Sequence, residues 1–200
     1  MNSKFFTASN VALLGILVAL TIVLQLFASA IPMFGITLNF SLIPIALASI
    51  LLGWLGGAII GFVSGMVTFI TMAILGQDIL TAYMFQTSPV LLTIICVGKT
   101  TIAGAVAGLV FKAISKKNLF IAVCVCALVI PVINTGIYLF GIALMKDAVI
   151  TKLGLTMSSA SAVVGFIFGL IWLNFLIEVA LNVVFIPMIH RVIRVISKVR

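Results

Sequence analysis

The feature that most constrains this chain is the length of its stretches without a charged residue. Three stretches contain no Asp, Glu, Lys or Arg: residues 5–77, 118–145 and 153–177. Each is longer than the roughly 20 apolar residues that cross a bilayer. Backbone polar groups in lipid must be satisfied within the segment itself, so such stretches form helices. The sequence therefore predicts an all-α integral membrane protein.

The composition excludes a soluble protein of ordinary type. Of the 200 residues, 64% are hydrophobic and only 7% are charged, whereas a soluble domain carries roughly a quarter charged residues. A buried core does not explain a deficit of that size. With so little polar chain, we expect a single transmembrane domain over residues 1–200.

We expect a bundle of six transmembrane helices, the second of them short. The expected ranges are 8–30, 39–52, 56–75, 89–113, 119–144 and 162–189. Proline, glycine or polar residues separate them, at 31–35, 53–57, 76–89, 115–118 and 146–161.

The first 30 residues allow a second interpretation. Ala28-Ser29-Ala30 resembles a signal-peptidase site, with Lys4 as the charged region before it. The apolar run is longer than the usual 7–15 residues of a signal peptide. Six helices also return both basic ends of the chain to one side, whereas cleavage leaves five. These two observations favour a retained first helix.

The basic residues predict the orientation of the bundle. The net charge is +8, and eight basic residues fall on one side of the predicted helices: Lys4, Lys112, Lys116, Lys117, Arg191, Arg194, Lys198 and Arg200. The other side has only two, accompanied by two acids: Lys146, Lys152, Asp78 and Asp147. This is the positive-inside pattern, so we expect both ends of the chain in the cytoplasm and no nucleic-acid surface.

Small residues recur at helical spacing on several of the expected helices. They lie in the third helix (Gly53, Gly57, Gly61, Gly65), the fourth (Gly104, Gly108), the sixth (Gly165, Gly169) and the first (Ala8, Ala12, Gly15, Ala19). Helices in lipid associate through close van der Waals contact over such residues. Internal packing explains the glycines. The stripe on the first helix suits either internal packing or the docking of another protein.

No catalytic grouping emerges from the ionisable residues. The chain has three acids and one histidine, His190, which lies beside Arg191 at the expected cytoplasmic end. Gly98-Lys99-Thr100 imitates the end of a phosphate-binding loop, but Thr93 stands where that motif requires glycine. The three cysteines have neither disulfide nor metal-ligand spacing. We expect no enzyme, no metal and no cofactor.

Polar residues inside the membrane are costly and usually functional. Lys99, Asn134 and Asn174 each lie ten to twelve residues, or about 15 Å, inward from the outer end of their helices. These depths predict a polar pocket that is open to the outside. Glu178 lies one turn deeper than Asn174. Lys99 therefore either contacts a ligand or pairs with Glu178 to hold the bundle together, and a pocket floor can do both.

Taken together, the motifs resemble the substrate-capture subunit (S component) of energy-coupling factor (ECF) transporters, the bacterial vitamin importers. The residues that carry this resemblance lie at 38–44 (Leu-Asn-Phe-Ser-Leu-Ile-Pro), 53–65, 88–89, 98–104, 131–136 and 174–178. The resemblance implies a bacterial plasma-membrane protein that binds a water-soluble vitamin near its extracellular side. The substrate-binding residues that we expect are Asn39, Lys99, Asn134, Tyr138, Trp172, Asn174 and Glu178.

The resemblance also implies partners: a transmembrane coupling subunit and two cytoplasmic ATPases. In the family an Ala-x-x-x-Ala face on the first helix meets the coupling subunit, and Ala8 and Ala12 match it, with Gly15 and Ala19 extending it. The cation at Lys99 favours pantothenate, whereas the aromatic residues suit a riboflavin-like ligand. Two alternatives remain: a stand-alone proton-coupled secondary transporter that uses Glu178, and an interaction subunit or small channel without a ligand.

Overall fold

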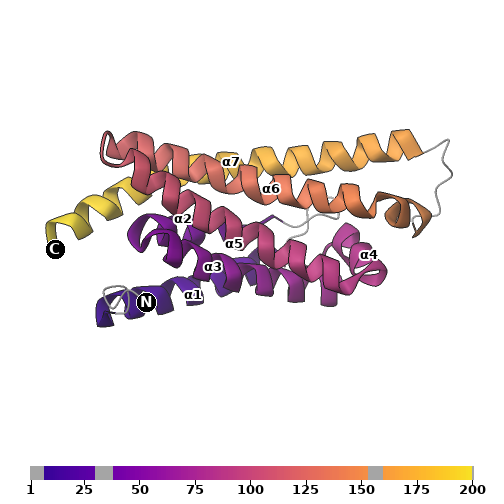
Figure 1. Cartoon of the computed structure of the whole chain (residues 1–200), viewed down its shortest axis with the longest axis horizontal. Helices are drawn as coiled ribbons and strands as arrows, with labels where there is room; N and C mark the ends of the chain where they lie inside the picture. The colour runs from indigo at the N-terminus through magenta and orange to yellow at the C-terminus, as the bar shows by residue number, and fades with distance from the viewer. Residues whose placement is uncertain (1–6, 30–37, 153–159, 200) are drawn as a thin grey trace.

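The computed structural model describes residues 7–29, 38–152 and 160–199 (Figure 1). Over these residues it is entirely helical, as predicted. The elements are α1 (Ala8–Ser29), α2 (Leu42–Leu51), α3 (Gly53–Thr68), its π-helical continuation η1 (Phe69–Ile74), α4 (Ile79–Thr87), α5 (Pro89–Ile114), α6 (Leu119–Lys152) and α7 (Ala160–Val199).

Five segments of the described chain are long and apolar enough to cross a membrane. They are Ala8–Ala28, Gly53–Ile74, Pro89–Ile114, Leu119–Met145 and Ile171–Ile189. The predicted short helix is present as α2, but its 10 residues extend only about 15 Å. That is half of the hydrocarbon core of a bilayer, so α2 does not span it alone. A single residue, Leu52, separates α2 from α3, and Gly53 adopts a φ of 74° that favours glycine.

Three of the predicted segments differ from the structure, because helices form in polar stretches. The segment 76–89, predicted as a connection, contains α4. The Asp78 carboxylate caps this helix by accepting a hydrogen bond from the Thr81 backbone N–H at 2.7 Å, and Pro89 lies just beyond its end. The other two differences are in length: α6 continues past residue 144, and α7 extends beyond both ends of the predicted range 162–189.

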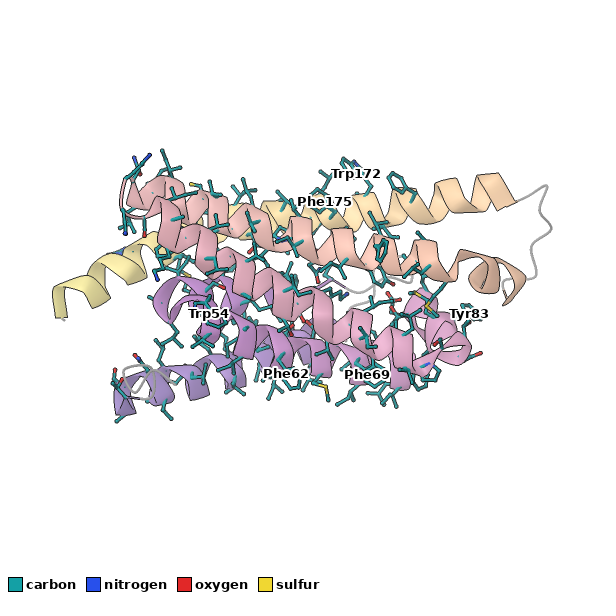
Figure 2. All side chains as sticks on the ribbon, viewed as in Figure 1. Trp54, Phe62, Phe69, Tyr83, Trp172 and Phe175 are labelled. Carbon is teal, nitrogen blue, oxygen red and sulfur yellow. The ribbon has the colours of Figure 1, made fainter. Side chains whose placement is uncertain are left out.

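The outer surface of the bundle is covered by large apolar side chains, and several polar side chains are buried inside, as expected for a protein in lipid. Large hydrophobic side chains point outward, among them Phe62 (50% exposed) and Trp172 (54% exposed), as Figure 2 shows. Buried polar side chains include Asn39, Lys99 and Glu178. A soluble protein buries its large apolar residues and leaves charged ones in water.

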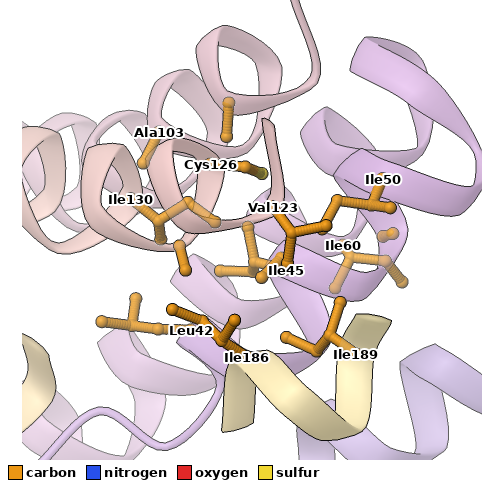
Figure 3. Packing of buried hydrophobic residues seen from close by; sticks show 14 of the residues in the cluster. Leu42, Ile45, Ile50, Ile60, Ala103, Val123, Cys126, Ile130, Ile186 and Ile189 are labelled. Atoms are coloured by element: carbon orange, nitrogen blue, oxygen red, sulfur yellow. The ribbon is translucent and has the colours of Figure 1, made fainter. Parts of the chain in front are cut away.

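The α2 helix lies at the centre of the apolar core. Its Leu42 and Ile45 are almost completely buried and pack with Ile60 of α3, Ile130 of α6 and Ile186 of α7 (Figure 3). This core fixes the position of the turn before α2, which carries Asn39. The turn and helices α5, α6 and α7 supply the polar pocket described below.

Glycines allow α3 and α5 to pack backbone against backbone. A Cβ atom added to Gly61 would collide with the Thr100 carbonyl, and one added to Gly57 with the Gly104 carbonyl. The Thr100 hydroxyl donates a hydrogen bond to the Gly61 carbonyl at 2.6 Å across this contact. Internal packing of the glycines is therefore confirmed for these two helices.

The corresponding prediction for the last helix is wrong. A Cβ atom added to Gly165 or Gly169 would have no neighbouring atom within 4 Å. The spacing of small residues alone does not show which side of a helix faces a neighbour. These two glycines of α7 have no packing role among the described residues.

The ends of the helices divide the bundle into a basic end and an end that carries α4. The start of α1, the turn between α5 and α6 and the end of α7 lie together, opposite α4 (Figure 1). The α5–α6 turn carries Lys116 and Lys117. The sequence places Arg191 and Arg194 near the end of α7.

Candidate binding site

One pocket brings together residues from six parts of the chain. It is lined by Asn39 before α2, Met72 of η1, Asp78, Thr81 of α4, Lys99 of α5, Asn134, Thr135 and Tyr138 of α6, and Ile171, Asn174 and Glu178 of α7. Six of the seven substrate-binding residues expected from the sequence are in this set. The seventh, Trp172, is not.

Lys99 is buried without a carboxylate partner. Only 6% of the residue is exposed, and its ammonium nitrogen lies 4.5 Å from the centroid of the Tyr138 ring, a cation–π contact. Among the described residues, no lysine or arginine nitrogen lies within 4.0 Å of a carboxylate oxygen. The Lys99–Glu178 ion pair considered from the sequence is therefore not formed.

Glu178 is equally buried, with 2% of the residue exposed. One carboxylate oxygen, Oε1, accepts a hydrogen bond from the Asn174 amide nitrogen at 3.1 Å. The other, Oε2, accepts no hydrogen bond of normal geometry, although the Asn39 backbone and the Asn134 side chain lie near the carboxylate. One turn deeper, the Asn182 amide donates to the Glu178 backbone carbonyl at 2.9 Å. The three side chains thus follow one face of α7 into the bundle.

Two more buried amide atoms in the pocket lack partners. They are Nδ2 of Asn39 and Oδ1 of Asn134, and both residues are at most 5% exposed. Leaving a buried polar group unpaired costs about 1–3 kcal/mol. Folded proteins contain few such groups, so each calls for an explanation. Several of them facing one pocket indicate a site that is completed by a polar ligand.

Hydrogen bonds connect this pocket to α4, which the sequence interpretation missed. The Tyr138 hydroxyl lies 3.0 Å from the Thr81 hydroxyl, and Thr81 begins the helix that Asp78 caps. The signal for α4 was present as an Asx cap at Asp78 followed by Ser88-Pro89. Met72 and Ile171 were not predicted either, because nothing distinguishes an apolar pocket residue from a core residue in the sequence.

Trp172 lies outside the pocket. Its side chain points away from the bundle (Figure 2) and lies 5.5 Å from Phe175, centroid to centroid. Together with Val132 and Phe168 it lines a separate apolar hollow between α6 and α7. Its depth in the helix matches that of Asn174, but two residues correspond to a rotation of about 200°. Trp172 therefore faces the lipid side.

The pocket is small. Its volume is about 30 Å³, which is room for about two water molecules. A vitamin-sized ligand needs several times that space. Ligand binding therefore requires the lining elements to move apart.

The stripe on α1 lies on the outer surface. Ala8, Ala12, Gly15 and Ala19 are all exposed, and a Cβ atom added to Gly15 would meet nothing within 4 Å. The opposite face of α1 is buried, with Leu17 only 3% exposed. In this structure the stripe takes no part in internal packing.

A bundle of apolar spans around a buried polar pocket is the architecture expected of a membrane transport protein. Comparison with known proteins agrees. Residues 11–143 match the family described as Thiamine transporter protein (Thia_YuaJ), and the chain belongs to this family. This makes it a multi-pass membrane protein of a vitamin-transporter family rather than of an enzyme family.

One curated relative points to a different vitamin. The pantothenic acid transporter PanT of Lactococcus lactis subsp. cremoris (strain MG1363) is 35% identical over 83 residues, which are 40% of this chain. The match covers 41% of the relative, less than half of its length. No solved structure matches the chain. Both vitamin-transporter matches fit the predicted resemblance to ECF S components.

Proposed function

We propose that this chain is the high-affinity substrate-capture subunit of an ECF-type importer for a water-soluble vitamin. It captures the vitamin from outside through a bundle of six helices in the membrane, of which α2 is too short to span the bilayer alone, with both ends of the chain in the cytoplasm, and releases it inward. The observation that carries the proposal is the set of buried, unpaired polar atoms from Asn39, Asn134 and Glu178 around one pocket. The placement of the basic residues supports the orientation, because Lys116 and Lys117 lie at the same end as the start of α1 and the end of α7 (Figure 1).

Pantothenate is the ligand that the pocket chemistry favours, with a riboflavin-like molecule as the second candidate. Lys99 offers a buried cation without a carboxylate partner, which suits the carboxylate of pantothenate. The unpaired oxygens of Asn134 and Glu178 suit its hydroxyl and amide donors. The name of the relative from Lactococcus lactis supports this choice. The family name makes thiamine, which is cationic, the necessary comparison.

Titration calorimetry of the purified chain tests the ligand assignment. We expect one-site binding of pantothenate, with dissociation constants for thiamine and riboflavin at least tenfold weaker. We assign the discrimination to Lys99, whose ammonium can form an ion pair with the carboxylate of pantothenate. Asp78 and Glu178 line the same pocket and would attract the thiazolium cation, so thiamine is the comparison that tests this assignment. Tighter binding of thiamine or riboflavin would reject pantothenate, and no binding of any of the three would reject the proposed vitamin capture.

The exposed stripe on α1 is the proposed docking face for the coupling subunit. Replacing Ala12 with Trp should prevent close helix approach there, reducing complex assembly and uptake by tenfold or more while ligand affinity stays within twofold. Phe140→Trp on the exposed face of α6 is the matched control and should change neither. Assembly is measured by co-purification with the coupling subunit and ATPases. Equal loss of ligand affinity in Ala12→Trp would remove the stripe from the docking assignment.

The energy source separates this proposal from a proton-coupled secondary transporter. The specific observation in favour of the second function is Glu178, a buried acid within a membrane span with one carboxylate oxygen unpaired. We expect uptake in cells to require the co-expressed coupling subunit and ATPases, and to stop on ATP depletion. Uptake by this chain alone that survives ATP depletion but collapses with a protonophore would establish the secondary transporter instead.

A further inference from the structure

The turn before α2 contains a serine whose hydroxyl is not used as its position suggests. Ser41 occupies the N-cap of α2, where a serine hydroxyl usually accepts a hydrogen bond from a free backbone N–H of the first turn. Here no such cap bond forms. The Ser41 hydroxyl instead donates to the side-chain oxygen of Asn39, two residues earlier. It also forms a hydrogen bond with the hydroxyl of Ser64 on α3.

The direction of these bonds follows from the number of protons. A serine hydroxyl has one proton to donate, and that of Ser41 goes to Asn39. Ser64 must therefore be the donor in its bond with Ser41. The result is a chain in which Ser64 donates to Ser41 and Ser41 donates to the Asn39 carbonyl. Ser41 and Ser64 are fully buried, with 0% exposed, so water does not compete for these bonds.

This chain occupies the oxygen of the Asn39 carboxamide. Its oxygen is held by Ser41, and its nitrogen, Nδ2, has no partner although the residue is 95% buried and lines the pocket. A free asparagine would satisfy either end of its amide, by donating or by accepting. With the oxygen bound to Ser41, the two N–H groups of the amide remain for the pocket.

We propose that Ser64 and Ser41 are positioning residues that make Asn39 a hydrogen-bond donor to the substrate, which therefore presents an acceptor oxygen, such as a carboxylate or carbonyl, to Asn39. This inference rests on the proposed function, because it concerns the same pocket. It adds a specificity rule: analogues with a donor group at that place are rejected. It also assigns a role to two buried serines that lie outside the pocket lining.

A double-mutant cycle in the purified full chain tests the proposal, with calorimetry against whichever of pantothenate, thiamine or riboflavin the wild-type protein binds. Ser41→Ala should weaken affinity about three- to tenfold, the value of one buried hydrogen bond. In an Asn39→Ala background the same change should have no further effect, because Ser41 acts through Asn39. Asn39→Asp should lose more affinity than Asn39→Ala, since a carboxylate would face the acceptor of the substrate.

Ser49→Ala is the matched control. Ser49 is equally buried on α2, but its single hydroxyl proton is shared between the Ile45 and Gly104 carbonyls, at 2.8 and 2.9 Å. This change should lower the melting temperature without changing ligand affinity in either background. If Ser41→Ala does not fold, Ser64→Ala provides the second test, with a smaller loss of affinity that Asn39→Ala again abolishes.

Three results would overturn the proposal. One is a Ser41→Ala effect of the same size with and without Asn39, which would make Ser41 purely structural. The second is unchanged affinity in Asn39→Ala, and the third is Asn39→Asp binding at least as tightly as wild type. Failure of the wild-type protein to bind any of the three vitamins would instead reject the proposed function, and the inference with it.

Discussion

Replacing Lys99 with Met should weaken vitamin binding about ten- to hundredfold while changing the stability of the ligand-free protein much less. The loss corresponds to the roughly 1–3 kcal/mol cost of leaving a buried polar group on the ligand unpaired. The stability is preserved because Lys99 has no ion pair to lose: its ammonium contacts the Tyr138 ring, and Glu178 is held by Asn174. Titration calorimetry and melting curves of the same samples measure the two quantities.

The double variant Lys99→Met with Glu178→Gln separates a ligand contact from a scaffold pair. If the two residues stabilised the bundle as an ion pair, Lys99→Met would strand a buried carboxylate and destabilise the protein, and Glu178→Gln would restore it. The observed geometry predicts instead that the double variant folds and still binds poorly. Full recovery of affinity in the double variant would remove Lys99 from the site.

Gly61→Ala should destabilise the bundle, although alanine has a higher helix propensity than glycine. A Cβ atom there would collide with the Thr100 carbonyl. Backbone atoms cannot rotate away as a side chain can, so α3 and α5 must separate, at a cost of roughly 1–3 kcal/mol or more. Thr100 follows Lys99 on α5, so ligand affinity should fall as well. Thermal unfolding in detergent measures the stability.

Gly98→Ala is the matched control for this prediction. Gly98 lies on α5, the helix that packs against Gly61, but a Cβ atom added at Gly98 would meet nothing within 4 Å. Its replacement by alanine should leave the free energy of unfolding unchanged or raise it by up to about 1 kcal/mol, the difference in helix propensity between the two residues. The melting temperature should therefore stay the same or rise. Equal stability of Gly61→Ala and wild type would contradict the close packing of α3 against α5.

The fold class could be predicted because the bilayer imposes it. Long charge-free stretches leave no alternative to helices, and Gly, Pro and Ser mark most of their ends. Helix α4 was not predicted, because hydropathy alone does not distinguish a polar segment that begins with an N-cap at Asp78 from a loop. The extension of α6 past residue 144 was missed for the same reason, since a helix that leaves the lipid continues to satisfy its own backbone.

The pocket could be predicted in part because depth along a helix follows from counting residues. Asn134, Asn174 and Lys99 were placed at one level by their distance from the helix ends, and all three line the pocket. Depth does not give the direction of a side chain. Trp172 has the depth of a pocket residue but faces outward, so its predicted place in the pocket is wrong. The partner of Lys99 could not be predicted, because both Tyr138 and Glu178 lie at a suitable depth. Only the packing of the helices places the ammonium over the Tyr138 ring.

Mass spectrometry of the small molecules retained by the protein, purified from its own host, tests the central claim of vitamin capture most directly. The account predicts one water-soluble vitamin, pantothenate first, at close to one molecule per chain and without any partner subunit. The amount should fall at least tenfold in Lys99→Met and stay unchanged in Phe140→Trp. A preparation that binds no vitamin, or that retains as much in Lys99→Met as in wild type, would contradict it.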